Sequence, residues 1–258
     1  MDKPQRILLI QLKRAGDVIV TTPVLAALKK KFPQTEIDFL VEKPFAPLLE
    51  NNPHLRQVCV YDKTRMLDVW RQVRAQRYDW IFDFQSSPRS ALVCLASGAR
   101  VTAGYRVPFW GMAYKRNVRR PDGRLPVVEG KFTLVEPVAG ELPGERARRV
   151  YLKDEERRWA QNALPSARPP VGLIPTHRHP VRRWHAASFV ALGQRLRAKD
   201  HPVWWFWGPG EEAYTRAIAV QVPGSAMIPA ASTGRKKTFE LGLEPIFDSA
   251  STYLVPRK

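Results

Sequence analysis

Short apolar runs alternate with amphipathic stretches along the first 165 residues of the chain. Continuous apolar runs are typical of buried strands, and apolar positions that recur once per helical turn indicate helices. This pattern predicts strands at residues 6–10, 36–41, 57–61, 80–84 and 100–105. It predicts helices at residues 20–31, 64–77, 129–140 and 154–164. Such alternation favours an α/β fold with a mostly parallel sheet and helices on both faces.

A proline-rich segment, PSARPP at 165–170, interrupts this pattern and is typical of a linker between domains. A second series follows, with strands expected at 171–176, 202–208 and 226–230 and helices at 186–199 and 211–222. The sequence therefore predicts a first domain over residues 1–165, a linker over 166–170 and a second domain over 171–233.

The second domain is expected to be incomplete. The residues that follow the linker are fewer than the roughly 150 that a full domain of this type needs. From Gly234 onward the sequence has no clear helical or strand period, so residues 234–258 are expected to form a divergent tail.

The charge of the chain narrows the choice of partners. Its 42 Lys and Arg against 24 Asp and Glu give a net charge of +18, which favours an anionic partner such as nucleic acid, a phosphorylated glycolipid or an acidic membrane face. Cys59 and Cys94 lie in apolar surroundings, as thiols in a reducing compartment do. Without an apolar run of the length of a signal peptide or a membrane span, a cytoplasmic protein is expected, with at most peripheral contact with the inner membrane.

Two groups of motifs then occur in order. The first half contains RILLIQLKRAGDVIVTTPVLAALKKKFPQTEIDFLVEKPFAPLLENNPHLRQV and YDWIFDFQSSPRSALVCLASGAR. The second half contains PPVGLIPTHRHPVRRWHAASFVALGQRL and VWWFWGPGEEAYTRAIA. Together they resemble the bacterial ADP-heptose:lipopolysaccharide heptosyltransferases, glycosyltransferase family 9. The resemblance implies a GT-B architecture of two Rossmann-like domains with parallel sheets, the acceptor on the first domain and the sugar nucleotide on the second.

The sequence departs from the family near its end. Family members have a D-x-G-P-x-H type loop that holds the sugar and phosphates of the donor, and this sequence contains none. A frameshift or premature stop near Thr233, or a genuinely shortened branch of the family, would account for the difference. Weak or no transferase activity is therefore expected of the 258-residue chain.

The candidate base is Asp17, because inverting glycosyl transfer needs a group that takes the proton of the attacking hydroxyl. The resemblance implies this role, since the family's proposed catalytic aspartate lies in a G-D element such as Gly16–Asp17. The spacing alone instead predicts that Asp17 caps the helix that contains Pro23. Such a cap binds free backbone N–H groups and stabilises a helix by about 1 kcal/mol.

The donor site is expected to be cationic, because the leaving diphosphate needs positive partners and guanidinium groups match phosphate oxygens. The resemblance implies that Glu211 contacts the nucleoside of the donor. The alternative is that Glu211 is an ordinary acid in the first turn of a helix, where it interacts favourably with the helix dipole. A solvated basic loop is the alternative for the residues after the strand at 171–176. The expected donor residues are Thr176, His177, Arg178, Arg182, Arg183 and Glu211.

The acceptor site is expected on the first domain. Gln85 and Arg89 match the family's D-x-Q-x-x-x-R pattern and follow the strand at 80–84. A basic series next to Phe109 and Trp110 would meet the phosphates and acidic sugars of a lipopolysaccharide inner core, although a merely solvated surface is the alternative. The full set of expected acceptor residues is Lys13, Arg14, Gln85, Arg89, Arg106, Arg116, Arg119 and Arg120.

These residues predict transfer of a heptose from ADP-heptose to the lipopolysaccharide inner core, with inversion and without a metal ion or cofactor. No D-x-D pair occurs, and His177 and His179 lack further ligands for a zinc site. The alternative is a non-catalytic basic protein that binds an anionic polymer or nucleic acid, but no nucleic-acid-binding motif occurs. A nucleotide-dependent oxidoreductase is disfavoured because the first turn lacks a G-x-G-x-x-G series.

Overall fold

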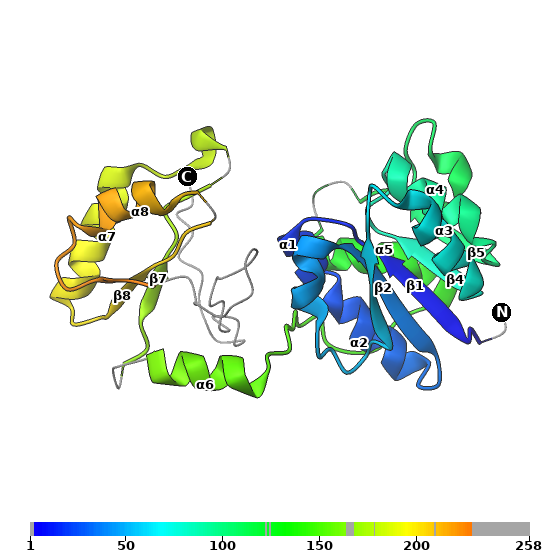
Figure 1. Cartoon of the computed structure of the whole chain (residues 1–258), viewed down its shortest axis with the longest axis horizontal. Helices are drawn as coiled ribbons and strands as arrows, with labels where there is room; N and C mark the ends of the chain where they lie inside the picture. The colour runs from blue at the N-terminus through cyan, green and yellow to red at the C-terminus, as the bar shows by residue number, and fades with distance from the viewer. Residues whose placement is uncertain are drawn as a thin grey trace. The chain divides into compact units, whose positions relative to one another are not determined.

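The structure, a computed structural model, describes residues 3–121, 123, 125–163, 168–177, 179–208 and 210–228 (Figure 1). Contacts within the chain divide it into two compact units, the first ending at Leu152 and the second beginning at Lys153. The division precedes the helix α6 (Asp154–Ala163), which the sequence pattern assigns to the first domain. None of the described side chains of α6 belongs to a hydrophobic cluster of either unit, so α6 joins neither core. The predicted tail, 234–258, lies outside the described residues.

A parallel sheet forms the centre of the first unit. Its strands lie in the order β3-β2-β1-β4-β5-β6, and every pair is parallel. They are β1 (Arg6–Ile10), β2 (Glu36–Glu42), β3 (Gln57–Tyr61), β4 (Trp80–Asp83), β5 (Val101–Tyr105) and β6 (Arg116–Val118). The first five confirm the strands predicted from apolar runs. The sequence pattern missed β6, because it has three residues within a basic segment and lies at the edge of the sheet.

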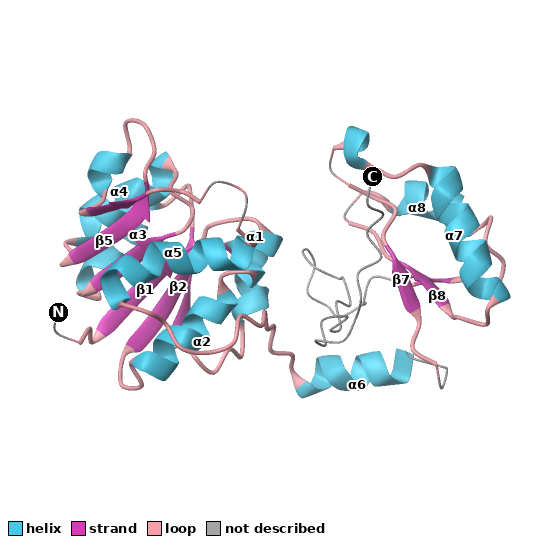
Figure 2. Ribbon diagram, turned by 180° about the vertical axis from the view of Figure 1, so that it is seen from behind, coloured by secondary structure: helices cyan, strands magenta, loops and turns pink. Residues whose placement is uncertain are grey.

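Helices cover both faces of this sheet, as the strand periodicity predicts (Figure 2). Ile7 and Leu9 of β1 pack on one face with α2 and α5. Leu8 and Ile10 pack on the other with α3 and α4, because successive side chains of a strand point to opposite faces. The helical segments of this unit are α1 (Ala15–Ile19), α2 (Thr22–Lys31), η1 (Lys43–Leu49), α3 (Met66–Ala75), α4 (Pro88–Ser97), η2 (Gly111–Ala113) and α5 (Val127–Ala139).

The helix predicted at 20–31 is present as α2, and the structure adds the short helix α1 before it, which the sequence pattern did not predict. The short helix α1 ends at Ile19, and α2 begins at Thr22 with Pro23 in its first turn, a position that proline favours. The Thr21 hydroxyl donates to the Asp17 carbonyl oxygen at 2.8 Å, and this bond joins the two helices at the bend.

The second unit has a parallel three-stranded sheet in the order β7-β8-β9 among its described residues. Trp205 is completely buried in its core, where Gly193 lets a helix approach closely: a Cβ there would lie 3.2 Å from the Trp205 ring. The elements are β7 (Val171–Leu173), η3 (Pro180–Arg182), α7 (Ala186–Ala198), β8 (Val203–Trp205), α8 (Glu212–Ala219) and β9 (Ala226–Met227). No helix among the described residues is long and apolar enough to cross a membrane.

Candidate functional site

The order of the first sheet reverses between β1 and β4, and open α/β sheets bind ligands at the carboxyl end of such a reversal. Gln11, which follows β1, joins the two loops that begin there. Its Nε2 donates to the Lys13 carbonyl at 2.6 Å and to Gln85 Oε1 at 2.9 Å. The Lys13 N–H also donates to Gln85 Oε1, at 3.1 Å. The structure therefore brings Lys13 and Gln85, two of the predicted acceptor residues, into one hydrogen-bonded group.

A buried carboxylate shapes the loop after β4. Asp83 is completely buried, and its Oδ1 accepts hydrogen bonds from the N–H groups of Gln85 and Ser86, both at 2.9 Å. Its Oδ2 accepts one from the Tyr114 hydroxyl at 2.7 Å. Burial raises the pKa of Asp83 to about 6. The acid of the D-x-Q-x-x-x-R pattern thus fixes the turn that presents Gln85.

Asp17 lies in the first turn of α1, and its side chain is exposed. Its Oδ2 atom accepts a hydrogen bond from the Arg14 N–H at the long distance of 3.5 Å. Asp17 does not cap the helix that contains Pro23, because that helix is α2, preceded by Thr21. An open cavity of about 720 Å³ adjoins Asp17, and its other lining residues are Arg14, Gly16, Val20, Pro126, Val127, Val128, Glu129, Arg146 and Arg148.

Sequence reasoning missed Lys131, a residue of α5 that is only 6% exposed. Its Nζ donates to Gln11 Oε1 at 2.7 Å, so it adjoins the hydrogen-bonded group at the end of β1. Burial lowers the pKa of Lys131 to about 8 against the opposing effect of the Asp17 carboxylate, and the positive charge of Arg120 lowers it further. The signal in the sequence is a lysine inside the apolar helix VVEGKFTLV, since lysine is seldom buried without a functional or structural partner.

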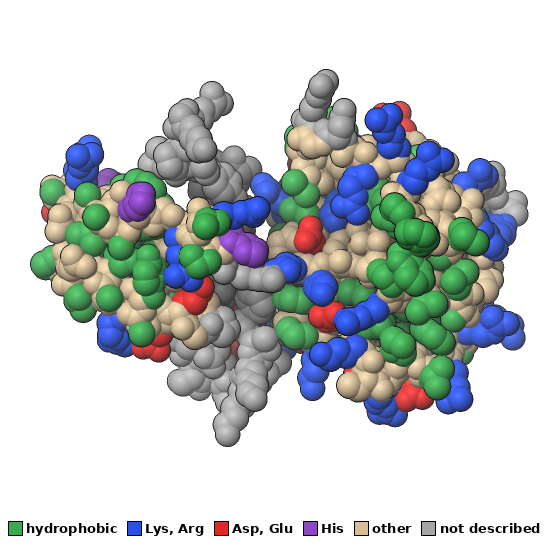
Figure 3. Space-filling view, turned by 90° about the horizontal axis from the view of Figure 1, so that it is seen from above, with side chains coloured by type: hydrophobic (Ala, Val, Ile, Leu, Met, Phe, Trp, Pro, Cys, Tyr) green, Lys and Arg blue, Asp and Glu red, His purple; other side chains and the backbone are tan. Residues whose placement is uncertain are grey.

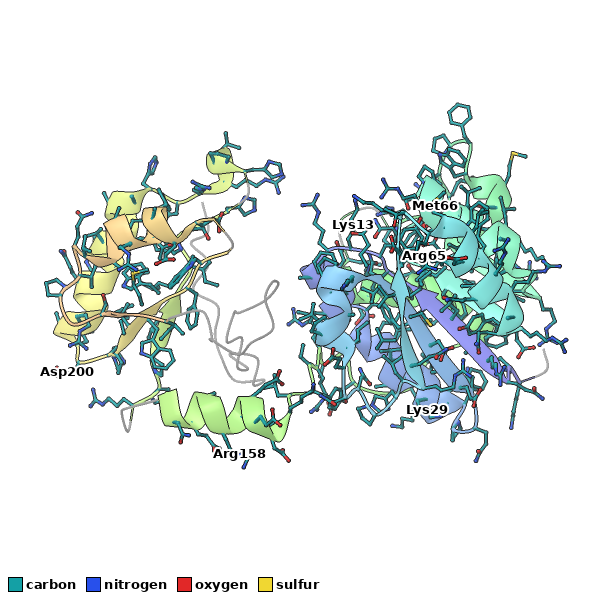
Figure 4. The ribbon with its side chains drawn as sticks, viewed as in Figure 1. Lys13, Lys29, Arg65, Met66, Arg158 and Asp200 are labelled. Atoms are coloured by element: carbon teal, nitrogen blue, oxygen red, sulfur yellow. The ribbon has the colours of Figure 1, made fainter. Side chains whose placement is uncertain are left out.

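Several predicted cations follow strands at the same edge. Arg106 comes after β5, and Arg119 and Arg120 come after β6. The Arg120 guanidinium lies 4.6 Å from the centre of the Tyr105 ring. Lys13 lies at this end of the unit and Lys29 at the opposite end (Figure 4).

Two further predicted acceptor residues, Arg89 and Arg116, do not directly follow a strand at the carboxyl edge of the sheet. Arg89 is exposed in the first turn of α4. Arg116 begins β6, so its backbone lies toward the amino end of that strand and away from the edge. Most of the predicted cations therefore follow strands at the carboxyl edge of the first sheet. Arg116 lies away from this edge.

In the second unit, Arg183 and Glu211 meet after β7 and β8. An Arg183 Nη2 nitrogen lies 3.7 Å from Glu211 Oε1, and the guanidinium lies 4.9 Å from the centre of the Tyr214 ring. Arg183 Nε also donates to the His177 carbonyl at 2.9 Å. The Gly208 N–H donates to Glu211 Oε2 at 3.1 Å. Arg183 thus links the loop after β7 to the start of α8.

The remaining predicted donor residues occupy the loop between β7 and α7. Thr176 is half-buried, and the Nδ1 atom of His177 accepts a hydrogen bond from the His179 N–H at 2.9 Å. Arg182 is exposed in η3. Arg178 lies outside the described residues. The part of the chain that the structure describes holds no group of three or more His, Cys, Asp or Glu side chains arranged to bind a metal ion.

Comparison with protein families identifies the chain. The family model described as glycosyltransferase family 9 (heptosyltransferase) matches residues 66–232. The chain belongs to this family. It is therefore a glycosyltransferase by class, as its motifs predict.

Curated members of glycosyltransferase family 9 resemble the chain over much of its length. It is 24% identical to a lipopolysaccharide heptosyltransferase 3 of Escherichia coli, over 93% of this chain and 74% of that protein. For the same enzyme of E. coli strain K12 the identity is also 24%, over 76% of this chain and 61% of that protein. Lipopolysaccharide core heptosyltransferase OpsX of Haemophilus influenzae is 25% identical over 40% of this chain and 31% of its own length.

Solved structures of family 9 share the fold. A family 9 glycosyltransferase of Veillonella parvula superposes with a TM-score of 0.77 at 19% identity, over 86% of this chain and 68% of that chain. E. coli heptosyltransferase II gives a TM-score of 0.70 at 22% identity, over 86% of this chain and 72% of that chain. E. coli heptosyltransferase WaaC, solved with ADP-2-deoxy-2-fluoro heptose, superposes with a TM-score of 0.69 at 19% identity. The match covers 89% of this chain and 78% of that chain. These likenesses confirm the α/β fold of the GT-B glycosyltransferases.

Proposed function

We propose that this chain transfers a heptose from ADP-heptose to a sugar of the lipopolysaccharide inner core, with inversion and without a metal ion. The observation that carries the proposal is Asp17, an exposed carboxylate beside a cavity lined by Arg14, Arg146 and Arg148 at the end of β1. The names of the relatives support the acceptor, and WaaC, solved with an ADP-heptose analogue, supports the donor.

Asp17 acts as the base. Its carboxylate takes the proton of an acceptor hydroxyl while that oxygen attacks the anomeric carbon of the heptose. The bond from the anomeric carbon to the diphosphate oxygen breaks at the same time, and its electron pair leaves with ADP. Attack opposite the leaving group inverts the anomeric centre. Because the contact from the Arg14 N–H is long, the carboxylate can still accept a hydrogen bond, and then the proton, from an acceptor hydroxyl group.

The acceptor binds at the carboxyl edge of the first sheet. Its acidic groups interact with Lys13, Arg106, Arg119 and Arg120, and arginine supplies paired donors for phosphate or carboxylate oxygens. Gln85 is held by its bonds with Gln11 and Lys13 and offers a rigid polar contact beside these charges. Arg14 and Arg89 add positive charge nearby, and Arg116 adds it from the amino end of β6.

The donor binds to the second unit, after β7 and β8. Arg183 and the exposed Arg182 interact with the diphosphate and stabilise the negative charge that develops on it. Glu211, now beside Arg183, accepts hydrogen bonds from the nucleoside. Thr176 and His177 contribute from the loop after β7, and Arg178, the next residue in the sequence, supplies a further guanidinium. With arginines in this role, the leaving group needs no metal ion.

A transferase assay of the chain with ADP-heptose and a heptose-deficient lipopolysaccharide tests the proposal. Mass spectrometry should detect a product heavier by one heptose, together with released ADP, and turnover should be weak because the sequence contains no D-x-G-P-x-H motif. Asp17→Asn should lower kcat by about a hundredfold or more, because general-base contributions are of this order. Asp68→Asn, on the exposed surface of α3, is the matched control and should retain wild-type activity.

Two outcomes would contradict the proposal. Full activity of Asp17→Asn beside an active wild type would remove Asp17 from the chemistry. Loss of activity on chelation of divalent cations, restored by adding the cation, would show that the reaction needs a metal.

A further inference from the structure

The loop between β5 and β6 exposes large apolar side chains. Phe109 is 90% exposed, Met112 is 91% exposed and Trp110 is 41% exposed. None of the three belongs to a hydrophobic cluster of the unit. Burial in the core therefore does not explain why these side chains are apolar, and contiguous exposed apolar side chains mark interaction sites.

The loop holds these side chains outward through its own backbone. The Gly111 N–H donates to the Val107 carbonyl at 3.1 Å, and the Trp110 N–H donates to the Pro108 carbonyl at 2.7 Å. Phe109 has a φ of 63°, a conformation that is unfavourable for a bulky residue. The segment η2 within the loop also packs against α4. The apolar tip is thus a folded feature of the unit.

Cations flank this tip in the sequence, and acids are absent there. No Asp or Glu occurs between Asp83 and Asp122. The cations of this interval are Arg89, Arg100, Arg106, Lys115, Arg116, Arg119 and Arg120. The space-filling view from above shows hydrophobic side chains gathered on this face of the first unit, with Lys and Arg and fewer Asp and Glu side chains around them (Figure 3).

We propose that the bilayer tip, defined as residues 107–114 with the flanking Arg106 and Arg116, docks on a bilayer of anionic phospholipids. Phe, Trp and Met side chains enter the boundary between head groups and acyl chains, and the Arg side chains interact with the anionic head groups. Nucleic acid is a poorer match, because the most exposed side chains of the tip are Phe109 and Met112 and a phosphate backbone offers them no apolar environment.

The bilayer tip follows β5 at its carboxyl end, the end at which Gln11 and Gln85 meet. A docked first unit would therefore present this edge close to the lipid surface. If the proposed function holds, a lipid-anchored acceptor would reach Asp17 without leaving the bilayer. Docking itself does not depend on the proposed function and can be measured without substrates.

Co-sedimentation with vesicles tests the docking. The chain should bind vesicles of phosphatidylcholine mixed with phosphatidylglycerol, and much less to phosphatidylcholine alone. The double variant Phe109→Ser/Met112→Ser should bind the mixed vesicles about tenfold or more weakly, because two large apolar side chains are lost. Arg106→Gln/Arg116→Gln should weaken binding and reduce its dependence on salt.

The matched control is Leu67→Ser/Val220→Ser, which removes two exposed apolar side chains from outside the bilayer tip. It should bind as the wild type does. Circular dichroism melts of all variants should agree with the wild type, because every substituted side chain is on the surface. Failure of the wild type to bind mixed vesicles, or equal binding by Phe109→Ser/Met112→Ser, would overturn the proposal. Binding of a protein partner through the tip without vesicle binding would do the same.

Discussion

Lys131 places an ammonium group in a nearly closed part of the first unit. Its hydrogen bond to Gln11 connects α5 to the loop after β1. With its pKa lowered to about 8, Lys131 is mainly cationic at neutral pH and loses its proton in mildly alkaline solution. The charge beside Asp17 therefore depends on pH in a range where enzymes are commonly assayed.

The free energy of unfolding should report this titration. The folded-state pKa of about 8 is lower than the usual 10.5, so the unfolded chain binds more protons between these values. The wild type should thus gain stability as pH rises through this window, by up to about 3 kcal/mol. Lys131→Met should lack the gain. Urea titrations at a series of pH values measure the difference between the two proteins.

Lys131→Arg is the control for this prediction, because arginine stays charged throughout the range. The free energy of unfolding of Lys131→Arg should therefore not show the rise with pH that is expected of the wild type. Identical pH dependence of all three proteins would contradict the lowered pKa of Lys131.

The elements of the first unit differ in how strongly the sequence specifies them. The strands β1 to β5 contain apolar runs that can be buried on both faces, so periodicity predicted them. The edge strand β6 was missed because its residues, RNV, carry little apolar signal and depend on pairing with β5. The short helix α1 was missed because its five residues are too few to show a helical period.

Packing of β5 against the segment before β6 depends on Gly104. A Cβ at this position would lie 2.5 Å from carbons of the Tyr114 ring, and Tyr114 is held by its hydrogen bond to Asp83. Gly104→Ala should therefore lower the free energy of unfolding by about 1–3 kcal/mol, the usual range for overpacking. Chemical denaturation measures the change. Gly16→Ala, where an added Cβ has no neighbour within 4 Å, should leave stability nearly unchanged, and equal stabilities of the two variants would refute the steric argument.

At the scale of the whole molecule, the net charge of +18 attracts any anionic polymer. Binding that depends on charge alone weakens steeply with salt, whereas the proposed acceptor also makes hydrogen bonds at the edge of the first sheet. We expect duplex DNA to displace little bound lipopolysaccharide at physiological salt, and the inner-core oligosaccharide to displace it efficiently. Fluorescence anisotropy of labelled lipopolysaccharide with each competitor measures this, and equal displacement by DNA at matched phosphate concentration would favour the alternative of a basic polymer-binding protein.

The sequence by itself determined the alternation of strands and helices, the two-part organisation and the position of Asp17 just after β1, because periodicity and turn residues act between near neighbours. Only the tertiary structure decided which distant residues meet. Gln11 and Lys131 are far apart in the chain, and so are Arg183 and Glu211 in their own unit, yet each pair is brought together by the packing of helices on sheets. The sequence also left open whether Phe109 is buried or exposed, since an apolar residue fits a core or an interface. Its exposure is fixed only by the positions of all the elements around it in the folded protein.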